Sequence, residues 1–181
     1  MNSQSKRKSI IFTGFMGTGK TETGKIVAKK LNMSFFDTDD LIERKADLSI
    51  NDIFKRYGEA CFRRIETEVI KEISKEESVV IACGGGVVLN PENIKVLRQR
   101  GIIINLCASV EVVYERLKNS ADRPLLKCKN PLIEIKKLLD VRKSVYADYD
   151  FTFNTDGLMA NEVADCILNK LNIKLVDCEV T

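Results

Sequence analysis

Histidine is absent from the 181 residues of this chain. The absence excludes Ser-His-Asp and Cys-His nucleophile systems, imidazole general bases and histidine metal ligands. Any acid–base chemistry must therefore use carboxylates, lysine, tyrosine or thiols.

Net charge is small, and closely spaced cysteine pairs are lacking. The 29 basic and 26 acidic residues leave a formal charge of +3, which is too slight to indicate a nucleic-acid-binding surface. Six cysteines at irregular spacing, with no C-x-x-C pair, disfavour a zinc site and a disulfide framework. No apolar run approaches the ~18 residues of a membrane span, and the N-terminus lacks the apolar segment of a signal peptide. We therefore expect a cytoplasmic protein without nucleic-acid or membrane partners.

The hydrophobic pattern is one of short apolar strands separated by helices. A chain of 181 residues fits one domain, and no repeat, low-complexity tract or linker suggests a second. Strands that are apolar throughout indicate a parallel sheet covered by helices on both faces. We expect a single α/β domain over residues 1–181. The expected strands are 10–13, 35–36, 79–82, 102–106 and 151–153.

Capping residues predict where two of the helices begin. Asn90 followed by Pro91 is typical of a helix start, and Gly101 predicts the end of that helix. Ser109 is the expected N-cap of another helix, because apolar residues at helical spacing follow it.

The glycines are concentrated in two short stretches, and the first predicts a phosphate site. Residues 14–21 read G-F-M-G-T-G-K-T, which matches G-x-x-x-x-G-K-[ST] between a predicted strand and helix. Glycines let backbone N–H groups face phosphate oxygens, and the helix N-terminus adds its positive dipole end. Lys20 is expected at the β- and γ-phosphates and Thr21 at Mg²⁺. A chance glycine turn is the alternative, which the strand-loop-helix context disfavours. The predicted ATP-binding residues of this loop are Gly17, Thr18, Gly19, Lys20, Thr21 and Glu22.

Two large classes of P-loop protein do not fit the remaining motifs. A regulatory GTPase needs D-x-x-G, which is absent, and N-K-x-D, of which the nearest candidate, residues 169–172, lacks the aspartate. A motor or transporter ATPase ends a core strand with an aspartate, whereas here Gly84 follows the strand and Cys83.

An acidic segment offers the carboxylates that such a site requires. Asp37 and Asp39 follow the strand 35–36, and residues i and i+2 of extended backbone face the same side. One carboxylate can hold Mg²⁺ while the other accepts the proton of an acceptor hydroxyl. The alternative is an acidic loop that caps the next helix, with Asp39 or Asp40 as the N-cap.

Two arginines lie on or beside helix faces that are expected to point inward. After Pro131, one expected helix face carries Ile135, Leu139, Tyr146 and Tyr149, and Arg142 falls within it. In the helix after Gly58, the inward face is marked by Phe62, Val69 and Ile73, with Glu66 among them. Arg63 lies beside this face, at i, i+3 spacing from Glu66. Each arginine either forms a structural ion pair or binds the carboxylate of an acceptor substrate. The second glycine stretch, Gly84, Gly85 and Gly86, would let backbone N–H groups approach a small polar acceptor.

A further basic segment predicts a lid. Residues 120–130 are polar, contain Pro124 and lie between helices, which fits a mobile lid whose Arg123 closes on the phosphates. A plain surface loop is the alternative. Arg116, one turn earlier, either stacks on adenine or is an exposed helix arginine.

Together these motifs resemble those of the bacterial shikimate kinase family over nearly the whole chain. The resemblance includes the phosphate loop, D-T-D at 37–39, and the glycine triplet. It also includes I-x-x-I-F at 50–54, G-E-x-x-F-R-x-x-E at 58–66, R-P-L at 123–125, and Arg142 with Tyr146.

The resemblance implies a nucleoside-monophosphate-kinase-like, three-layer P-loop fold with a five-stranded parallel sheet. An acceptor-binding helical segment is expected over about 39–73 and a lid over about 120–130. The implied activity is transfer of the γ-phosphoryl group of ATP to the 3-hydroxyl of shikimate, in aromatic amino-acid biosynthesis. ATP and shikimate are then the partners, Mg²⁺ is the cofactor, and the expected state is a monomer.

Residue roles follow from the resemblance by matching positions. Asp39 would hold the acceptor hydroxyl as base, with Lys20 and Arg123 as further catalytic groups. The implied substrate-binding residues are Asp39, Phe54, Phe62, Arg63, Gly84, Gly85, Gly86 and Arg142. The implied metal-binding residues are Thr21 and Asp37, and the implied ATP-binding residues outside the phosphate loop are Arg116 and Arg123. Cys83 is a departure, since the family often has a hydroxyl residue there.

Other functions remain open from the sequence. A kinase for another hydroxylated acid such as gluconate, or for a nucleoside monophosphate, would share the phosphate loop. A non-catalytic ATP-binding regulator would bind nucleotide without acceptor-dependent release of ADP.

Overall fold

The computed structural model describes residues 8–118, 130–142, 146 and 149–171. In this part of the chain, five parallel strands form one sheet in the order β2-β3-β1-β4-β5. The sheet confirms the predicted α/β class. Each strand is one or two residues longer than its expected range, except β3, whose bounds were predicted correctly. The strands are β1 Ser9–Thr13, β2 Ser34–Asp37, β3 Val79–Ala82, β4 Gly101–Cys107 and β5 Phe151–Asn154.

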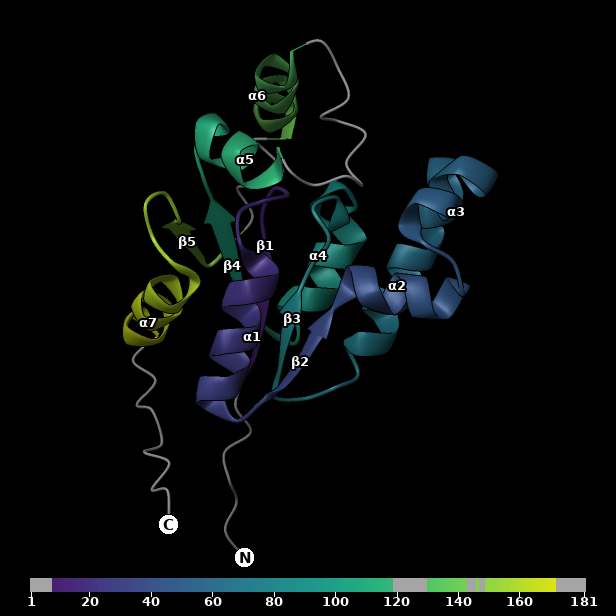
Figure 1. Cartoon of the computed structure of the whole chain (residues 1–181). Coiled ribbons are helices and arrows are strands. Elements are labelled where there is room, and N and C mark those ends of the chain that lie inside the picture. The colour runs from purple at the N-terminus through teal and green to yellow at the C-terminus, as the bar shows by residue number, and fades with distance from the viewer. Residues whose placement is uncertain (1–7, 119–129, 143–145, 147–148, 172–181) are drawn as a thin grey trace, which may run out of the picture.

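Helices cover both faces of the sheet, which gives three layers (Figure 1). One face is covered by α1 (Lys20–Leu31) and α7 (Ala160–Lys170). The other is covered by α3 (Ile50–Ile73), η1 (Val87–Leu89) and α4 (Pro91–Arg98). The short helix α2 (Thr38–Ala46) packs on α3. Beyond the carboxyl end of β4 lie α5 (Val110–Leu117) and α6 (Pro131–Arg142).

Alternate residues of the central strand fill the two cores. Ile10 and Phe12 of β1 pack against α1 and α7, while Ile11 packs against the α3 and α4 layer. All three are almost completely buried. Burying a side chain of this size stabilises the fold by about 1.5–3 kcal/mol, so the central strand is held firmly from both sides. The phosphate loop that follows β1 therefore starts from a rigid base.

The capping predictions were correct at two helix starts and wrong at one helix end. The side chain of Asn90 caps α4 by accepting from the N–H of Glu92, and Ser109 caps α5 by accepting from Val112. Gly101 is not a helix terminator, because α4 already ends at Arg98 and Gly101 begins β4. A side chain at Gly101 would overlap the carbonyl of Ser9 on the neighbouring strand, so the glycine serves strand pairing.

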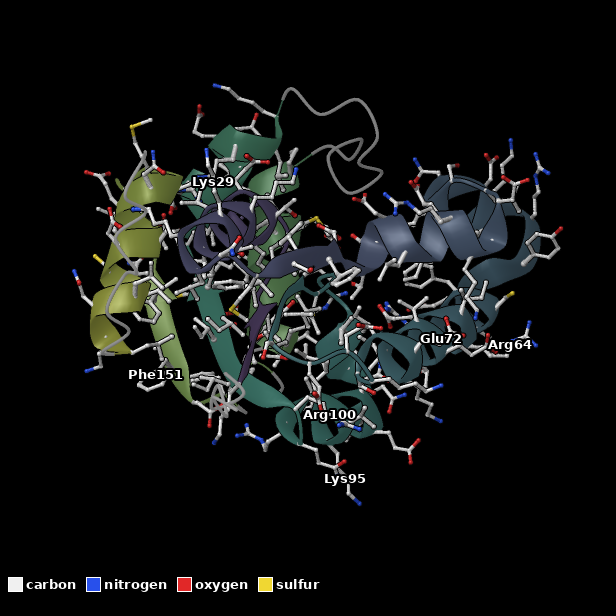
Figure 2. The ribbon with its side chains drawn as sticks, turned by 90° about the horizontal axis from the view of Figure 1, so that it is seen from below. Lys29, Arg64, Glu72, Lys95, Arg100 and Phe151 are labelled. Atoms are coloured by element: carbon white, nitrogen blue, oxygen red, sulfur yellow. The ribbon has the colours of Figure 1, made fainter. Side chains whose placement is uncertain are left out.

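The outward faces of the helices are strongly charged. Figure 2 shows Arg64 and Lys95 at the periphery of the molecule, and both are exposed, as is Lys29. The pattern is that of helices with one apolar face against the sheet. Within the described ranges, no helix combines the length and the hydropathy that crossing a membrane requires.

Candidate active site

The phosphate loop connects β1, at the centre of the sheet, to the start of α1. Gly14 and Gly19 have φ of +138° and +88°, which side-chain-bearing residues rarely adopt. A side chain at Gly14 would also overlap the carbonyl of Leu106 on β4. The hydroxyl of Thr18 donates to the carbonyl of Phe15 at 2.8 Å, which holds the loop closed on itself. The glycines are thus required by backbone conformation and by the close approach of β4.

Lys20 lies at the first position of α1 and is largely buried. Its Nζ donates to the carbonyls of Gly14 and Phe15, each at 2.9 Å. A buried ammonium needs such acceptors, because desolvating an unpaired charge is costly. The lysine therefore stands beside the helix N-terminus, where the backbone N–H groups and the dipole favour an anion.

Thr21 and Asp37 meet across the gap between α1 and β2. The Thr21 hydroxyl donates to Asp37 Oδ2 at 2.7 Å. Asp37 Oδ1 accepts the backbone N–H of Asp39 at 3.0 Å, so Asp37 is the N-cap of α2. One carboxylate thus joins the phosphate loop to the acidic segment.

The geometry corrects two expectations about the acidic segment. Asp39 is not in extended backbone, because β2 ends at Asp37 and α2 begins at Thr38. The N-cap is also not Asp39 or Asp40, because the side chain that caps α2 belongs to Asp37. Asp39 instead occupies the first helical turn, where the dipole favours its negative charge.

A cavity of about 210 Å³ brings the predicted groups together. The cavity is lined by the phosphate loop, by both aspartates and by part of the glycine triplet. These motifs are far apart in the sequence and border one space, whereas Phe54, Phe62, Arg63, Gly86 and Arg142 do not line it. The lining residues are Met16, Gly17, Gly19, Lys20, Thr21, Glu22, Asp37, Asp39, Cys83, Gly84 and Gly85.

The donors available for a metal are few and oxygen-based. No group of three histidine, cysteine or acidic residues suited to a metal occurs among the described residues. A hydroxyl and a carboxylate, from Thr21 and Asp37, lie side by side in the cavity. This set suits Mg²⁺, which is commonly bound by one or two protein groups together with substrate phosphates and water.

The glycine triplet is packed against two of the predicted acceptor-binding side chains. A Cβ at Gly84 would overlap Oδ1 of Asp39, and a Cβ at Gly86 would overlap the guanidinium of Arg63. The backbone N–H of Gly84 donates to the hydroxyl of Thr38 at 2.8 Å. Gly84 and Gly86 are therefore needed because a side chain at either position would displace Asp39 or Arg63.

Arg63 is bound by two glutamates of its own helix. Its guanidinium donates to Glu66 at 2.9 Å and to Glu59 at 3.1 Å. Glu66 is 1% exposed, and burial raises the pKa of its carboxyl, an effect that Arg63 partly offsets. The structural ion pair left open by the sequence is thus present. The side chain of Arg63 keeps 27% exposure, so part of it still reaches solvent.

Two phenylalanines of α3 form the apolar wall beside this arginine. The rings of Phe54 and Phe62 lie 4.7 Å apart, and the Arg63 guanidinium lies 5.0 Å from the Phe62 ring centre. Phe62 is buried and Phe54 is 39% exposed. Gly58, with φ +78°, interrupts the helix between them, which lets both rings approach each other.

Arg142, at the end of α6, lies over the phosphate loop. Its guanidinium is 5.8 Å from the ring centre of Phe15. It also contacts Tyr146, whose hydroxyl donates to the carbonyl of Gly85 at 2.5 Å. Burial raises the pKa of Tyr146, so the phenol stays protonated and keeps this donor. Tyr146 and Tyr149 lie beyond the end of α6 rather than on its face, which corrects the expected helix face.

Arg116 is held at the other side of the phosphate loop. It donates to the carbonyl of Gly17 at 3.1 Å, and to the hydroxyl and carbonyl of Thr155 at 2.9 and 2.8 Å. Arg116 and Thr155 line a cavity of about 230 Å³ together with Thr18 and Gly19. The sequence did not single out Thr155, for which the only signal is a threonine just after the last strand. Arg123 and residues 119–129 of the expected lid lie outside the described residues.

Cys83 is a buried residue at the floor of the site. It is 2% exposed, and its N–H donates to the carbonyl of Phe12 at 2.9 Å. Burial strongly raises the pKa of its thiol, so the sulfur is neutral at physiological pH. The thiol therefore contributes a small, uncharged surface to the cavity wall.

Comparisons with known proteins agree over most of the chain. The sequence model of the family described as shikimate kinase matches residues 16–172. A shikimate kinase of Thermodesulfovibrio yellowstonii is 48% identical over 163 residues, which cover 90% of this chain and 94% of that protein. A shikimate kinase from Geobacter sulfurreducens is 43% identical, covering 90% of each chain.

A solved structure extends the agreement to three dimensions. Shikimate kinase from Acinetobacter baumannii, in complex with shikimate, superposes with a TM-score of 0.87 at 35% identity, covering 92% of this chain and 93% of that one. The family match continues from within the phosphate loop past the end of α7, so it is not limited to a P-loop shared by many enzymes. This chain belongs to the shikimate kinase family.

Proposed function

We propose that the chain transfers the γ-phosphoryl group of ATP to the 3-hydroxyl of shikimate, with Asp39 as the base. In this reaction the acceptor oxygen forms a bond to the γ-phosphorus, and the bond from that phosphorus to the β-γ bridging oxygen breaks. The hydroxyl proton passes to the Asp39 carboxylate, and ADP leaves. Since phosphoryl transfer has a loose transition state, positioning and charge neutralisation supply most of the catalysis.

On the nucleotide side, the phosphate loop and α1 hold the phosphates. Lys20 moves from the carbonyls of Gly14 and Phe15 to phosphate oxygens, and Gly17, Thr18, Gly19 and the start of α1 donate backbone N–H groups. The position of Arg116 beside the 230 Å³ cavity supports a role at the adenine, with Glu22 at the rim of both cavities. Arg123 would close on the phosphates, a role implied by the family resemblance.

Thr21 and Asp37 are the residues that would hold Mg²⁺. When bound, the ion would neutralise charge on the β- and γ-phosphates. The 2.7 Å hydrogen bond between the two side chains supports this assignment, because it keeps both oxygen donors in one place. Asp37 is further fixed by capping α2.

On the acceptor side, Arg63 and Arg142 would bind the carboxylate of shikimate. Both side chains are partly exposed, and a planar guanidinium suits bidentate binding of a carboxylate. Phe54 and Phe62 would wall the ring, while Gly84, Gly85 and Gly86 would approach its hydroxyls.

The single observation that carries the roles of Lys20, Thr21, Asp37 and Asp39 is the 210 Å³ cavity. All four residues line it, so the proposed phosphate, metal and base residues border the same space of about 210 Å³. A gluconate kinase or nucleoside monophosphate kinase is not favoured by the family match, and neither is a regulator without turnover.

Coupled measurement of ADP release tests the proposal. Shikimate, gluconate and nucleoside monophosphates are offered in parallel, each with ATP and Mg²⁺ and with an acceptor-free blank. We expect acceptor-dependent release with shikimate. Release with gluconate and none with shikimate would overturn the assignment, and release with no acceptor would indicate an ATPase.

The remaining expectations concern the state of the protein. We expect a monomer in the cytoplasm that has no nucleic-acid or membrane partner. The irregular spacing of the six cysteines supports a reducing compartment. Sedimentation analysis of the full chain tests the monomer directly, since a dimer would double the measured mass.

A further inference from the structure

The donor edges of the Arg63 guanidinium are occupied by three residues, Gly86, Glu66 and Glu59. A guanidinium can bind a carboxylate bidentately at two of its edges. One edge is the end of the group, between Nη1 and Nη2, and the other is the side formed by Nε and Nη2. The edge that can be opened decides where the carboxylate of an acceptor can bind.

The end of the guanidinium is closed by the backbone of Gly86. A Cβ at Gly86 would overlap Nη1, and it would lie 2.6 Å from Nη2 and 2.8 Å from Cζ. Because this position is nearer to both terminal nitrogens than to the carbon that joins them, it lies beyond the end of the group rather than above its face. Gly86 therefore fills the space that a carboxylate bound end-on would need.

Glu66 is a fixed partner of the same guanidinium. Both of its carboxylate oxygens accept from Nη1, at 3.1 and 2.9 Å, and its side chain is 1% exposed. Opening such a buried ion pair is costly, because the buried carboxylate would be left without a compensating charge. We therefore expect Glu66 to keep Arg63 when an acceptor binds.

Glu59 occupies the side edge of the guanidinium. Its Oε1 accepts from both Nε and Nη2 of Arg63, at 3.2 and 3.1 Å. The contact lies close to solvent, since the Glu59 side chain is 64% exposed. Exposed ion pairs contribute little to stability, because water solvates both charges when the pair opens. The side edge is thus held by a carboxylate that is easily released.

The position of Arg142 favours replacement of Glu59 by a second carboxylate. Burial raises the pKa of the Tyr146 phenol, and the charges of Arg142 and Arg63 both offset part of this rise. Both guanidinium groups therefore lie near one phenol. Within the described residues, Glu59 pairs with Arg63 alone. An acceptor carboxylate that reaches both arginines gains a contact that Glu59 lacks.

We propose that Glu59 is an internal competitor of the acceptor, because its carboxylate occupies the side edge of Arg63 and is displaced when the acceptor carboxylate binds. This inference rests on the proposed function, in which Arg63 binds the carboxylate of shikimate. Glu59 does not line the 210 Å³ cavity, where the phosphate, metal and base residues lie. It therefore sets the affinity for the acceptor and leaves the chemical step unchanged.

Glu59→Gln tests the competition, because glutamine keeps the size of the side chain and removes its charge. The KM for shikimate should fall by about two- to fivefold, which is the contribution of an exposed ion pair. The kcat and the KM for ATP should stay the same. If Glu59 instead orients Arg63 for the acceptor, the KM for shikimate would rise. A raised or unchanged KM for shikimate would overturn the proposal.

Glu68→Gln is the matched control for the loss of one negative charge. Glu68 lies on the same helix, α3, its side chain is 48% exposed, and it pairs with Lys45. We expect this variant to keep the KM of the unaltered protein for shikimate. An equal fall of the KM in both variants would contradict the proposal, because the charge of the helix would then explain it without the contact to Arg63.

A crystal structure of the complex with shikimate shows the exchange directly. We expect the acceptor carboxylate on Nε and Nη2 of Arg63, Glu59 beyond hydrogen-bond distance, and Glu66 still on Nη1. Glu59 still bound to both nitrogens in the complex would overturn the inference. An unaltered protein without shikimate-dependent release of ADP would overturn the proposed function and this inference with it. Normal turnover with an unchanged KM in Glu59→Gln would overturn this inference alone.

Discussion

The hydroxyl of Thr21 and the carboxylate of Asp37 lie 2.7 Å apart, although the residues belong to different elements. Thr21 is in the first turn of α1, and Asp37 ends β2. The same carboxylate caps α2 through the N–H of Asp39. Asp37 therefore links the proposed metal site to the start of the helix that carries the proposed base.

Replacing Asp37 separates its two roles. Asparagine caps helices about as well as aspartate but carries no charge, so Asp37→Asn should keep stability and raise the Mg²⁺ concentration needed for half-maximal rate. Asp37→Ala loses the cap as well and should destabilise the fold by about 1 kcal/mol. Thermal unfolding and Mg²⁺ titration of the rate measure the two effects.

The N-cap of α4 provides a control for the loss of stability expected in Asp37→Ala. Asn90 caps α4 and does not line the active-site cavity. Asn90→Ala should lower stability by about 1 kcal/mol with an unchanged Mg²⁺ requirement. If Asp37→Asn has the Mg²⁺ requirement of the unaltered enzyme, Asp37 is a structural cap only.

Asp39→Asn should lower kcat by about 10²–10⁴-fold, because the amide cannot accept the proton of the acceptor hydroxyl. The dissociation constant of ATP should change little, since Asp39 faces the acceptor. Asp40→Asn is the matched control, because Asp40 is the next residue of α2 and is exposed. Normal turnover of Asp39→Asn would remove this residue as the base.

Arg142→Ala should raise the shikimate KM by about ten- to a hundredfold, the effect of losing a charge-assisted hydrogen bond to a carboxylate. The KM for ATP should change much less. Arg142→Lys keeps the charge but not the planar pair of donors, so we expect an intermediate KM. Equal effects on both substrates would indicate that Arg142 acts through Phe15 and the phosphate loop instead.

Two glycine substitutions should separate turnover from acceptor binding. Gly84→Ala would push the Asp39 carboxylate aside and should lower kcat by about a hundredfold. Gly86→Ala would displace the Arg63 guanidinium and should chiefly raise the shikimate KM. Steady-state kinetics distinguish the two, with the KM for ATP as the internal reference. The same kinetic pattern in both variants would contradict the distinct contacts of the two glycines.

The Arg63 and Glu66 pair should make stability depend on pH in a predictable direction. Burial raises the pKa of Glu66 above its ordinary value of about 4.5 in the folded state, and Arg63 offsets part of this rise. Between the unfolded and folded pKa the native state binds more protons, so this contribution to stability falls as pH rises. Arg63→Met removes the charge that partly offsets the rise in the Glu66 pKa. The free energy of unfolding should therefore keep falling to higher pH, by on the order of 2 kcal/mol near neutrality.

Urea unfolding between acidic and neutral pH measures this dependence. In the double variant Arg63→Met with Glu66→Gln, the added pH dependence should disappear, because the titrating group is gone. Arg64→Ala serves as the control, since Arg64 is the exposed neighbour on α3. A pH profile of Arg63→Met parallel to that of the unaltered protein would show that Glu66 is not the group responsible.

The strands and the phosphate loop were predictable because their signals are local. A fully apolar run such as Ile10–Phe12 has few alternatives to a buried strand, and the glycine spacing of the loop specifies its backbone. The inward face of α3 was predictable for the same reason, since Phe62, Glu66 and Val69 follow helical spacing.

The contacts between distant segments could not be predicted in this way. The end of β2 at Asp37 depends on a cap whose competitors, Asp39 and Asp40, look equally suitable in the sequence. The hydrogen bond from Tyr146 to Gly85 joins residues 61 positions apart, and no periodic pattern encodes it. The same applies to Arg116 and Thr155, which meet only because β5 lies beside β4.

The two carbonyls that accept from Lys20 have a consequence for selectivity among anions. The Lys20 ammonium already donates hydrogen bonds to the carbonyls of Gly14 and Phe15. An anion that binds there therefore replaces these hydrogen bonds rather than adding to them. A singly charged anion such as chloride or acetate gains little from such an exchange. A polyphosphate gains more, since its greater charge also meets the N–H groups of the loop and the end of α1. The resting loop thereby discriminates against the abundant small anions around it before any nucleotide arrives.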